Sequence, residues 1–183
     1  EDVEFLVEAY RKVNGRDPEH LREDFCGTGL LASHWIKRNA QCTAEGYDID
    51  PDPVEWGKRK NFAPLGADAE RMRFRMLDVR EPSLVPPDVR CAHNFSYCIF
   101  KTRTELIGYL KSVYEDLAPD GVFSLDIHGG PESIEEMEEE REVEEGFDYV
   151  WDQDEYWPVT AEAKCYIHFR FRDGSELRKA FTY

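Results

Sequence analysis

Two glycines and a later carboxylate have the residue types and the spacing needed to hold a nucleotide. Gly27 and Gly29 follow a short predicted strand, and the segment from Gly27 to Ala32 fits the pattern G-x-G-x-x-A. Asp48 comes 19 positions after Gly29, at the end of the next predicted strand. Glycines let the backbone approach a ligand closely, and an acid at this distance accepts hydrogen bonds from both ribose hydroxyls. The pattern predicts an adenosine-containing ligand but does not say which one.

A metal site is not expected. The run Asp-Ile-Asp-Pro-Asp at 48–52 has the acidic spacing that begins a calcium loop. Position six of that loop would be Pro53 where glycine is required, and position twelve would be Arg59 where glutamate is required. Five scattered cysteines without a C-x-x-C pair indicate reduced thiols, which is typical of a cytoplasmic protein and not of a zinc site.

Strands and helices alternate along the first two thirds of the chain and would position these residues. Strands are predicted at 21–25, 42–48, 72–77, 89–95 and 122–127. Helices are predicted at the N-terminus, after Gly29, from about Pro53, and over 102–117, where Thr102 and Glu105 have capping-box spacing. This alternation predicts an α/β fold with an open, doubly wound, mostly parallel sheet. In such a sheet, ligands bind beyond the carboxyl ends of the strands.

The pattern changes after residue 149. Cys165, Ile167, Phe169 and Phe171 alternate with polar residues, which predicts a half-buried strand, and Asp173-Gly174 predicts a hairpin turn. We expect a single domain over 1–183, with a cofactor-binding core at 21–128 and an accessory antiparallel hairpin at 149–183. Because the chain ends inside the last predicted strand, we expect the domain to continue beyond it.

The segment 132–145 contains nine glutamates and one arginine, half of the net charge of −16. We interpret it as a solvated helix in preference to an acidic docking site. The acidity disfavours nucleic acid as a partner, because a phosphate-binding surface needs clustered basic residues. No stretch is long and apolar enough for a membrane helix.

Four short motifs occur in order: Cys-Gly-Thr-Gly at 26–29, Gly-Tyr-Asp at 46–48, Leu-Asp-Val at 77–79, and Leu-Ala-Pro-Asp-Gly-Val-Phe at 117–123. Together, over about 21–127, they resemble the motif series of the class I S-adenosylmethionine-dependent methyltransferases. The resemblance implies the Rossmann-like fold of that family, S-adenosylmethionine as cofactor, and methyl transfer to a small-molecule acceptor. The cofactor-binding residues that it implies are Glu23, Cys26, Gly27, Gly29, Asp48, Ile49, Asp78, Val79 and Asn94.

The resemblance also suggests residues for the methyl acceptor. Many amino-methyltransferases have Asn or Asp, two prolines and an aromatic residue after the fourth strand. This chain has Asn94 and Tyr97 there but lacks both prolines, so packing at the strand end explains the pair equally well. His128, directly after the fifth strand, is a candidate base. We expect a neutral or cationic acceptor, such as an amine, covered by the aromatic segment 151–157.

Phe25 stands where the family has its first glycine, and Asp120 replaces a later one. A side chain at position 25 would narrow the methionine pocket or change how the loop turns. Two alternatives therefore remain: an NAD-binding oxidoreductase, and a degenerate methyltransferase fold that serves as a non-catalytic binding module.

Overall fold

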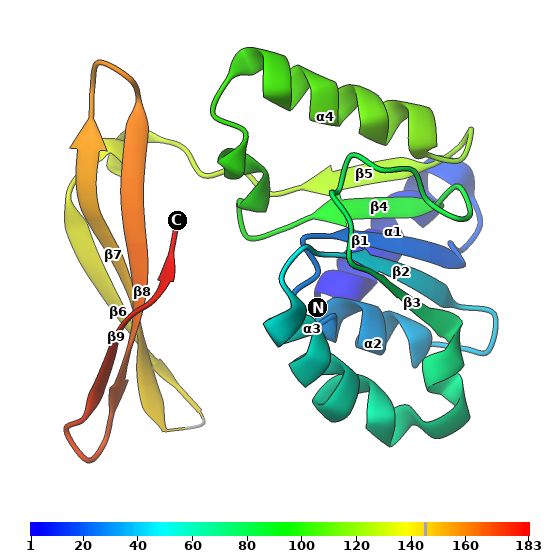
Figure 1. The fold of residues 1–183 in the computed structure, drawn as a ribbon, viewed down its shortest axis with the longest axis horizontal. Coiled ribbons are helices and arrows are strands. Elements are labelled where there is room, and N and C mark those ends of the chain that lie inside the picture. Colours follow the sequence, from blue (N-terminus) through cyan, green and yellow to red (C-terminus); the bar gives the residue numbers. More distant parts are fainter. Residues whose placement is uncertain (145) are drawn as a thin grey trace. The chain divides into compact units, whose positions relative to one another are not determined.

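A five-stranded parallel sheet forms the centre of the N-terminal part of the chain (Figure 1). Its strands are β1 (His20–Asp24), β2 (Thr43–Tyr47), β3 (Met72–Arg75), β4 (Val89–Ala92) and β5 (Val122–Leu125). They lie in the order β3-β2-β1-β4-β5, and every neighbouring pair is parallel. The predicted doubly wound sheet is confirmed; β1 is shifted by one residue from its predicted range, and the other four strands are somewhat shorter than theirs.

Helices cover both faces of this sheet. They are α1 (Asp2–Asn14), α2 (Leu30–Ile36), α3 (Pro51–Gly57), a π-helical segment (Lys58–Phe62), two 3-10 segments (Ala63–Arg71 and Ser96–Ile99) and α4 (Arg103–Asp116). Thr102 and Glu105 form the predicted reciprocal capping box at the start of α4. The connection from β3 to β4 contains neither helix nor strand.

Two apolar clusters pack on the sheet. The larger one joins α1 and α2 to one sheet face, with Trp35, Tyr10 and Leu21 fully buried at its centre. The smaller one lies under α4 and includes Tyr47, Ala92 and Tyr109. Because side chains alternate across a strand, Arg22 and Asp24 of β1 point to the α4 side and Glu23 to the other.

The chain divides into two compact units, Glu1–Asp126 and Ile127–Tyr183. The structure describes residues 1–144 and 146–183. The second unit contains a 3-10 segment (Pro131–Ile134) and an antiparallel sheet of β6 (Met137–Val143), β7 (Phe147–Trp157), β8 (Glu162–Phe171) and β9 (Glu176–Thr182). The predicted C-terminal hairpin is thus β8 and β9 within a larger four-stranded sheet.

Our prediction of a helix in the glutamate-rich segment is wrong for the residues described; Glu145 lies outside them. Residues 137–143 form the edge strand β6, paired with β7. Arg170 of β8 ion-pairs with Glu138 and Glu140 of β6 and with Glu176 of β9. Charged residues suit an exposed sheet edge because they oppose pairing with another chain.

The polar alternate positions of β8 also differ from the prediction. Tyr166 and His168 occupy the positions that alternate with Cys165, Ile167 and Phe169 and that a half-buried strand would expose, yet both are buried. The ring of His168 contacts Asp152 at 2.9 Å through Nε2, and its Nδ1 accepts a hydrogen bond from the backbone N–H of Lys179. Paired in this way, a polar ring is accommodated inside the sheet.

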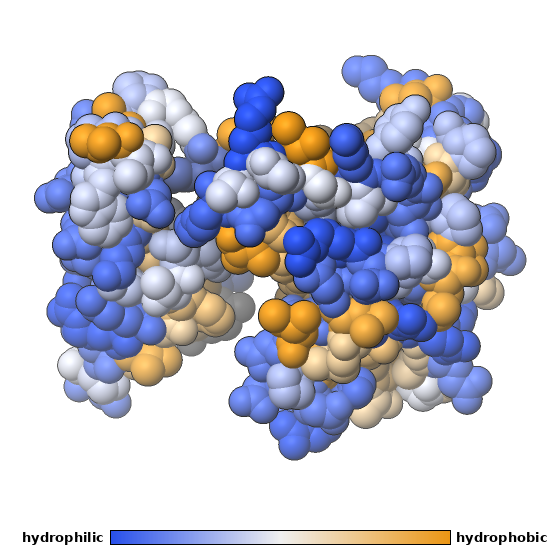
Figure 2. Space-filling view, turned by 45° about the horizontal axis from the view of Figure 1, so that its top comes forward, coloured by the Kyte–Doolittle hydropathy of each residue, from blue (hydrophilic) through white to orange (hydrophobic). Residues whose placement is uncertain are grey.

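Within the described residues, no helix has the length and apolar character required to cross a membrane. Figure 2 shows hydrophilic residues over most of the visible face and apolar residues in separate patches, in keeping with a mean hydropathy of −0.66.

Candidate functional site

The strand order places the candidate site at the carboxyl ends of β1, β2, β3 and β4. The connection from β1 leads through α2 to β2 on one side, whereas β4 lies on the other side of β1. Strand order reverses between these neighbours, which is where open parallel sheets bind ligands. The predicted cofactor-binding residues lie in the loops that follow these four strands. The exception is Glu23, which lies near the end of β1 itself.

The glycine loop after β1 has the conformation that its glycines allow. Gly27 and Gly29 have φ values of 49° and 62°, a left-handed conformation that glycine adopts without steric cost. A Cβ atom on Gly29 would lie 3.0 Å from the rings of Phe62 and Phe74. A Cβ atom on Gly27 would meet no atom within 4 Å, so the backbone is open to an approaching ligand there.

Asp48 is held in place by hydrogen bonds from the glycine loop after β1 and from its own loop after β2. Its Oδ2 accepts a hydrogen bond from the backbone N–H of Gly27 at 2.7 Å, and its Oδ1 accepts one from Asp50 at 2.9 Å. Each carboxylate oxygen can accept a second hydrogen bond. Ile49, the next residue, is 74% exposed beside it. An oriented acid next to an exposed apolar side chain can bind a ribose and the base attached to it.

Among the acids of the site, Glu23 has the most strongly shifted pKa. Its Oε2 accepts a hydrogen bond from the backbone N–H of Ala32 at 3.1 Å, at the start of α2. The side chain keeps a small opening to solvent, but protein atoms surround it on most sides. This burial, together with the nearby carboxylates of Asp48 and Asp24, raises the pKa of Glu23 to about 8. The hydrogen bond from Ala32 acts in the opposite direction and lowers the pKa, but it does not outweigh the burial. Such a carboxyl group gains stability from a cationic ligand.

Cys26 is part of the packing of the loop. Its side chain is buried, and burial raises the pKa of its thiol well above the ordinary range. Its Sγ lies 2.8 Å from the position that a Cβ atom on Gly46 would occupy, so the loop and β2 pack closely here. Gly57 of α3 makes a similar approach, since its Cβ position lies 2.1 Å from the Thr28 carbonyl oxygen.

Asp78 and Val79 follow β3. The guanidinium of Arg80 donates to both carboxylate oxygens of Asp78, at 2.8 and 2.6 Å, and these bonds hold the pKa of Asp78 below its ordinary value. Val79 is buried in the smaller apolar cluster. The backbone N–H of Arg80 also donates to Oδ1 of Asp78, at 2.9 Å. Asp78 therefore has a fixed orientation, with an acceptor site left on Oδ2.

Asn94 and Phe95, after β4, form a tight turn in which both residues have left-handed φ values of 58° and 54°. The carboxylate of Asp126 accepts hydrogen bonds from both of their backbone N–H groups, at 2.6 and 3.0 Å. Asp126 thus holds the exposed Asn94 in place. Our sequence interpretation missed this residue, although it follows β5 directly, at the sheet edge where we weighed the other loops.

The position of Phe25 answers the question raised by its replacement of a glycine. Its φ of 55° is the left-handed value that a glycine would supply. Its ring lies 6.3 Å from that of Phe100 and 6.2 Å from that of Tyr109, in the cluster under α4. The loop therefore turns as a glycine loop does, and the ring packs in the apolar cluster.

Tyr97 is partly buried against the same cluster, which raises its pKa. His128 belongs to the second unit, where it is exposed and its ring lies 5.8 Å from that of Trp151. Among the described residues, no group of His, Cys, Asp or Glu side chains is arranged to hold a metal ion.

No protein-family profile matches the sequence, and no curated protein matches it significantly. Solved structures with a similar fold include a S-adenosylmethionine-dependent methyltransferase from Clostridium acetobutylicum ATCC 824, with a TM-score of 0.72 and 19% identity over 99% of this chain and 70% of that chain. The SAM-bound amino pentose methyltransferase CalS10 from Micromonospora echinaspora gives 0.74 and 18%, over 99% and 74%. DesVI from Streptomyces venezuelae gives 0.70 and 17%, over 99% and 73%.

These similarities confirm the fold predicted from the motif series. The chain has the Rossmann-like fold of the S-adenosylmethionine-dependent methyltransferases, with an additional antiparallel sheet of four strands in its C-terminal unit.

Proposed function

We propose that this protein is a methyltransferase that binds S-adenosylmethionine at the carboxyl ends of β1 to β4 and methylates a small molecule. The observation that carries the proposal is the hydrogen bond between Asp48 and the Gly27 backbone, which joins the predicted ribose acid to the predicted glycine loop. Solved structures of the same fold include a sugar N-methyltransferase from Streptoalloteichus sp ATCC 53650 and the amino pentose methyltransferase CalS10.

The residues present suit this cofactor. Asp48 would accept the ribose hydroxyls, Ile49 would contact the adenine, and Asp78 would accept its amino group. The open side of Gly27 allows close approach, and the buried carboxyl of Glu23 would pair with the methionine ammonium group. Cys26, Gly29, Val79 and Asn94 complete the proposed binding residues. When bound, the cofactor supplies an already activated methyl group on a sulfonium sulfur.

The protein then has to align a nucleophile with that methyl group and exclude water, and a strong base is optional. We propose Asn94 and Tyr97 as acceptor-binding residues and His128 as a candidate base. An amine is the proposed acceptor class, because the Asn94 side chain can accept a hydrogen bond and the net charge of −16 attracts cations.

Calorimetry with S-adenosylhomocysteine tests cofactor binding, with NADH as the competing ligand. Asp48→Ala should weaken S-adenosylhomocysteine binding by roughly 1.5–3 kcal/mol for each hydroxyl hydrogen bond lost to a charged acceptor. Asp50→Ala is the matched control, since this exposed carboxylate caps α3 through the Asp52 N–H. Binding of NADH alone would indicate an oxidoreductase. Binding of S-adenosylhomocysteine without transfer to any acceptor in a metabolite screen would indicate a binding module.

Two substitutions at Tyr97 separate the acceptor role from packing. Tyr97→Phe keeps the ring in the cluster under α4 and removes only the hydroxyl. If the hydroxyl orients the acceptor, turnover should fall about tenfold or more while S-adenosylhomocysteine affinity stays unchanged. If Tyr97→Phe retains full turnover while Tyr97→Ala unfolds the domain, Tyr97 is a packing residue.

A further inference from the structure

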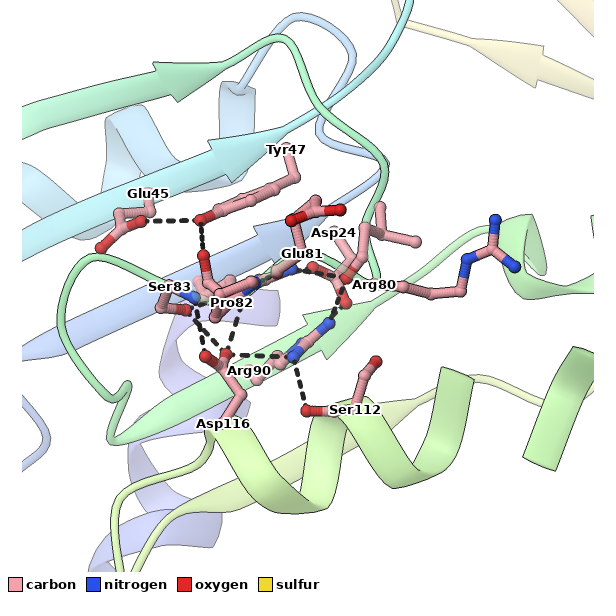
Figure 3. Close-up of polar contacts among 12 residues, drawn as sticks. Asp24, Glu45, Tyr47, Arg80, Glu81, Pro82, Ser83, Arg90, Ser112 and Asp116 are labelled. Atoms are coloured by element: carbon pink, nitrogen blue, oxygen red, sulfur yellow. Dashed lines mark hydrogen bonds and ion pairs between the residues drawn. The ribbon is translucent and has the colours of Figure 1, made fainter. Parts of the chain in front are cut away.

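The segment 79–85, between β3 and β4, lies where a doubly wound fold usually has a crossover helix, yet it has no regular structure. A loop packed on a sheet must find partners for backbone groups that a helix would pair internally. Here side chains of the sheet and of α4 supply them. Figure 3 shows this cluster, in which the backbone of the loop faces inward-pointing polar groups.

Two arginines form the centre of the cluster. Arg22 of β1 and Arg90 of β4 are register partners on adjacent strands, and both side chains are fully buried. Each guanidinium donates a hydrogen bond of 2.6 Å to the same acceptor, the carbonyl oxygen of Val79. Two strong donors on one carbonyl fix the position of that peptide group.

Two aspartates neutralise the arginines. Asp24 accepts one hydrogen bond from the Nε of each arginine, both at 2.8 Å. Asp116, at the end of α4, accepts from Arg22 at 3.1 Å and from Arg90 at 3.0 Å. Tyr109 of α4 also donates its hydroxyl hydrogen to Asp24. The charges are therefore paired on all sides, as burial requires.

The rest of the segment is held in the same manner. Arg22 also donates to the Glu81 carbonyl oxygen and to the Ser83 hydroxyl oxygen. Asp116 accepts from the backbone N–H of Ser83 at 2.7 Å, and Tyr47 donates to the Pro82 carbonyl at 2.7 Å. The buried Glu45 accepts from the N–H groups of residues 84 and 85. Successive peptide groups are thus tied to the sheet and to α4.

This arrangement bears on the site because Val79 is adjacent to Asp78. The arginine pair holds Val79 from inside the fold, while Arg80 binds both oxygens of Asp78 from outside. Replacement of a buried ion network by apolar residues is often neutral or stabilising, so stability alone does not account for so many buried charges. A fixed peptide at the end of β3 does account for them.

We propose that Arg22 and Arg90 are positioning residues for the cofactor base: by holding the Val79 carbonyl, they place Asp78 and the Val79 N–H to read the adenine edge. The inference rests on the proposed function. It predicts that loosening the cluster impairs discrimination between bases more than it impairs contacts to the ribose or the amino acid.

The test compares the affinities of S-adenosylhomocysteine and S-inosylhomocysteine, which carries a carbonyl oxygen in place of the adenine amino group. Wild type should prefer the adenosine compound by about tenfold or more, because the Asp78 carboxylate would face an acceptor in the inosine compound. Arg90→Lys keeps the charge but removes the guanidinium fork, and it should lower this preference at least about threefold. Ser83→Ala removes only the hydroxyl, which accepts from Arg22 and donates to Asp116, and it serves as the milder variant should Arg90→Lys fold poorly.

Two controls separate positioning from stability and from cofactor binding in general. Leu6→Ala removes a buried side chain of the cluster around α1 and should lower the melting temperature without changing the preference. Asp48→Ala should weaken both ligands equally. All variants are measured below their melting temperatures, as followed by circular dichroism.

If wild type binds S-adenosylhomocysteine but shows no preference, or if Arg90→Lys and Ser83→Ala keep the full preference, the positioning role is wrong and the proposed function stands. If wild type binds neither compound, the proposed function fails and the inference fails with it.

Discussion

Glu23 combines a largely enclosed position with a proposed role that requires a negative charge. Its pKa of about 8, raised from 4.5 chiefly by burial, means that the folded protein holds a proton on this group at neutral pH. A group whose pKa is higher in the folded state stabilises the fold fully below its unfolded pKa, and that contribution is lost as the pH rises through the folded pKa.

We therefore expect the wild-type free energy of unfolding to fall between about pH 5 and pH 8.5, by on the order of 3 kcal/mol after allowance for residual exposure. Urea unfolding at several pH values measures this change. Glu23→Gln should show a flatter profile over that range. S-adenosylhomocysteine affinity should show the opposite trend and rise up to about tenfold per unit from pH 6 to 8, because the ammonium group needs the ionised carboxyl. An equal pH dependence of stability in wild type and Glu23→Gln would contradict the prediction.

At the residue scale, spacing along the chain predicted which loops lie close together. Asp48 and Gly27 were singled out from a distance along the chain, and the structure joins them by a hydrogen bond. Asp126 was missed because its role is defined only by two left-handed residues after β4, and such backbone angles leave no pattern in Asn94 or Phe95. The sequence shows that Phe25 departs from the family's glycine. The direction of its side chain, however, depends on packing contacts that form only in the folded protein.

Helix α4 shows what local sequence determines at the scale of one element. The hydroxyl of Thr102 accepts a hydrogen bond from the Glu105 backbone N–H at 3.2 Å, and the Glu105 carboxylate accepts one from the Thr102 N–H at 3.0 Å. Thr102→Ala should reduce the free energy of unfolding by about 1 kcal/mol, measured by urea titration. Thr104→Ala, an exposed position in the first turn, is the control and should cost no more than a few tenths of that. Equal losses from the two variants would indicate that the capping box does not stabilise the protein.

Elements whose state depends on distant partners were the ones that sequence patterns did not identify. The segment 137–143 has a composition typical of a solvated helix, yet it pairs with β7, and its acids meet Arg170 from β8. The segment 79–85 shows no helical periodicity in its sequence. Its backbone groups are paired by buried side chains from other elements, including the two arginines, so its own sequence does not indicate its structure. Arg22, Glu23 and Asp24 make β1 a polar strand, and the partners that pair Arg22 and Asp24 come largely from other elements of the fold.

At the scale of the whole molecule, the acidic charge is unevenly distributed. Residues 127–183 contain 16 acidic and six basic side chains, a formal charge of −10 out of −16, whereas the unit with the parallel sheet carries −6. Several of the glutamates are paired with Arg170. The net charge of the molecule still sets the long-range field that a small charged ligand meets on approach.

This field gives a test of the proposed acceptor class. A cationic amine should show a kcat/KM that falls several-fold as ionic strength rises from about 0.02 to 0.2 M, because the Debye length shrinks from roughly 20 to 7 Å and attraction is screened. The control is an uncharged acceptor of similar shape, such as the corresponding alcohol or amide, assayed at the same salt concentrations for transfer or for competitive inhibition. Its constants should change little. If kcat/KM for the amine is insensitive to salt or increases with it, electrostatic attraction does not select the acceptor, and a neutral molecule becomes the better candidate for the proposed acceptor.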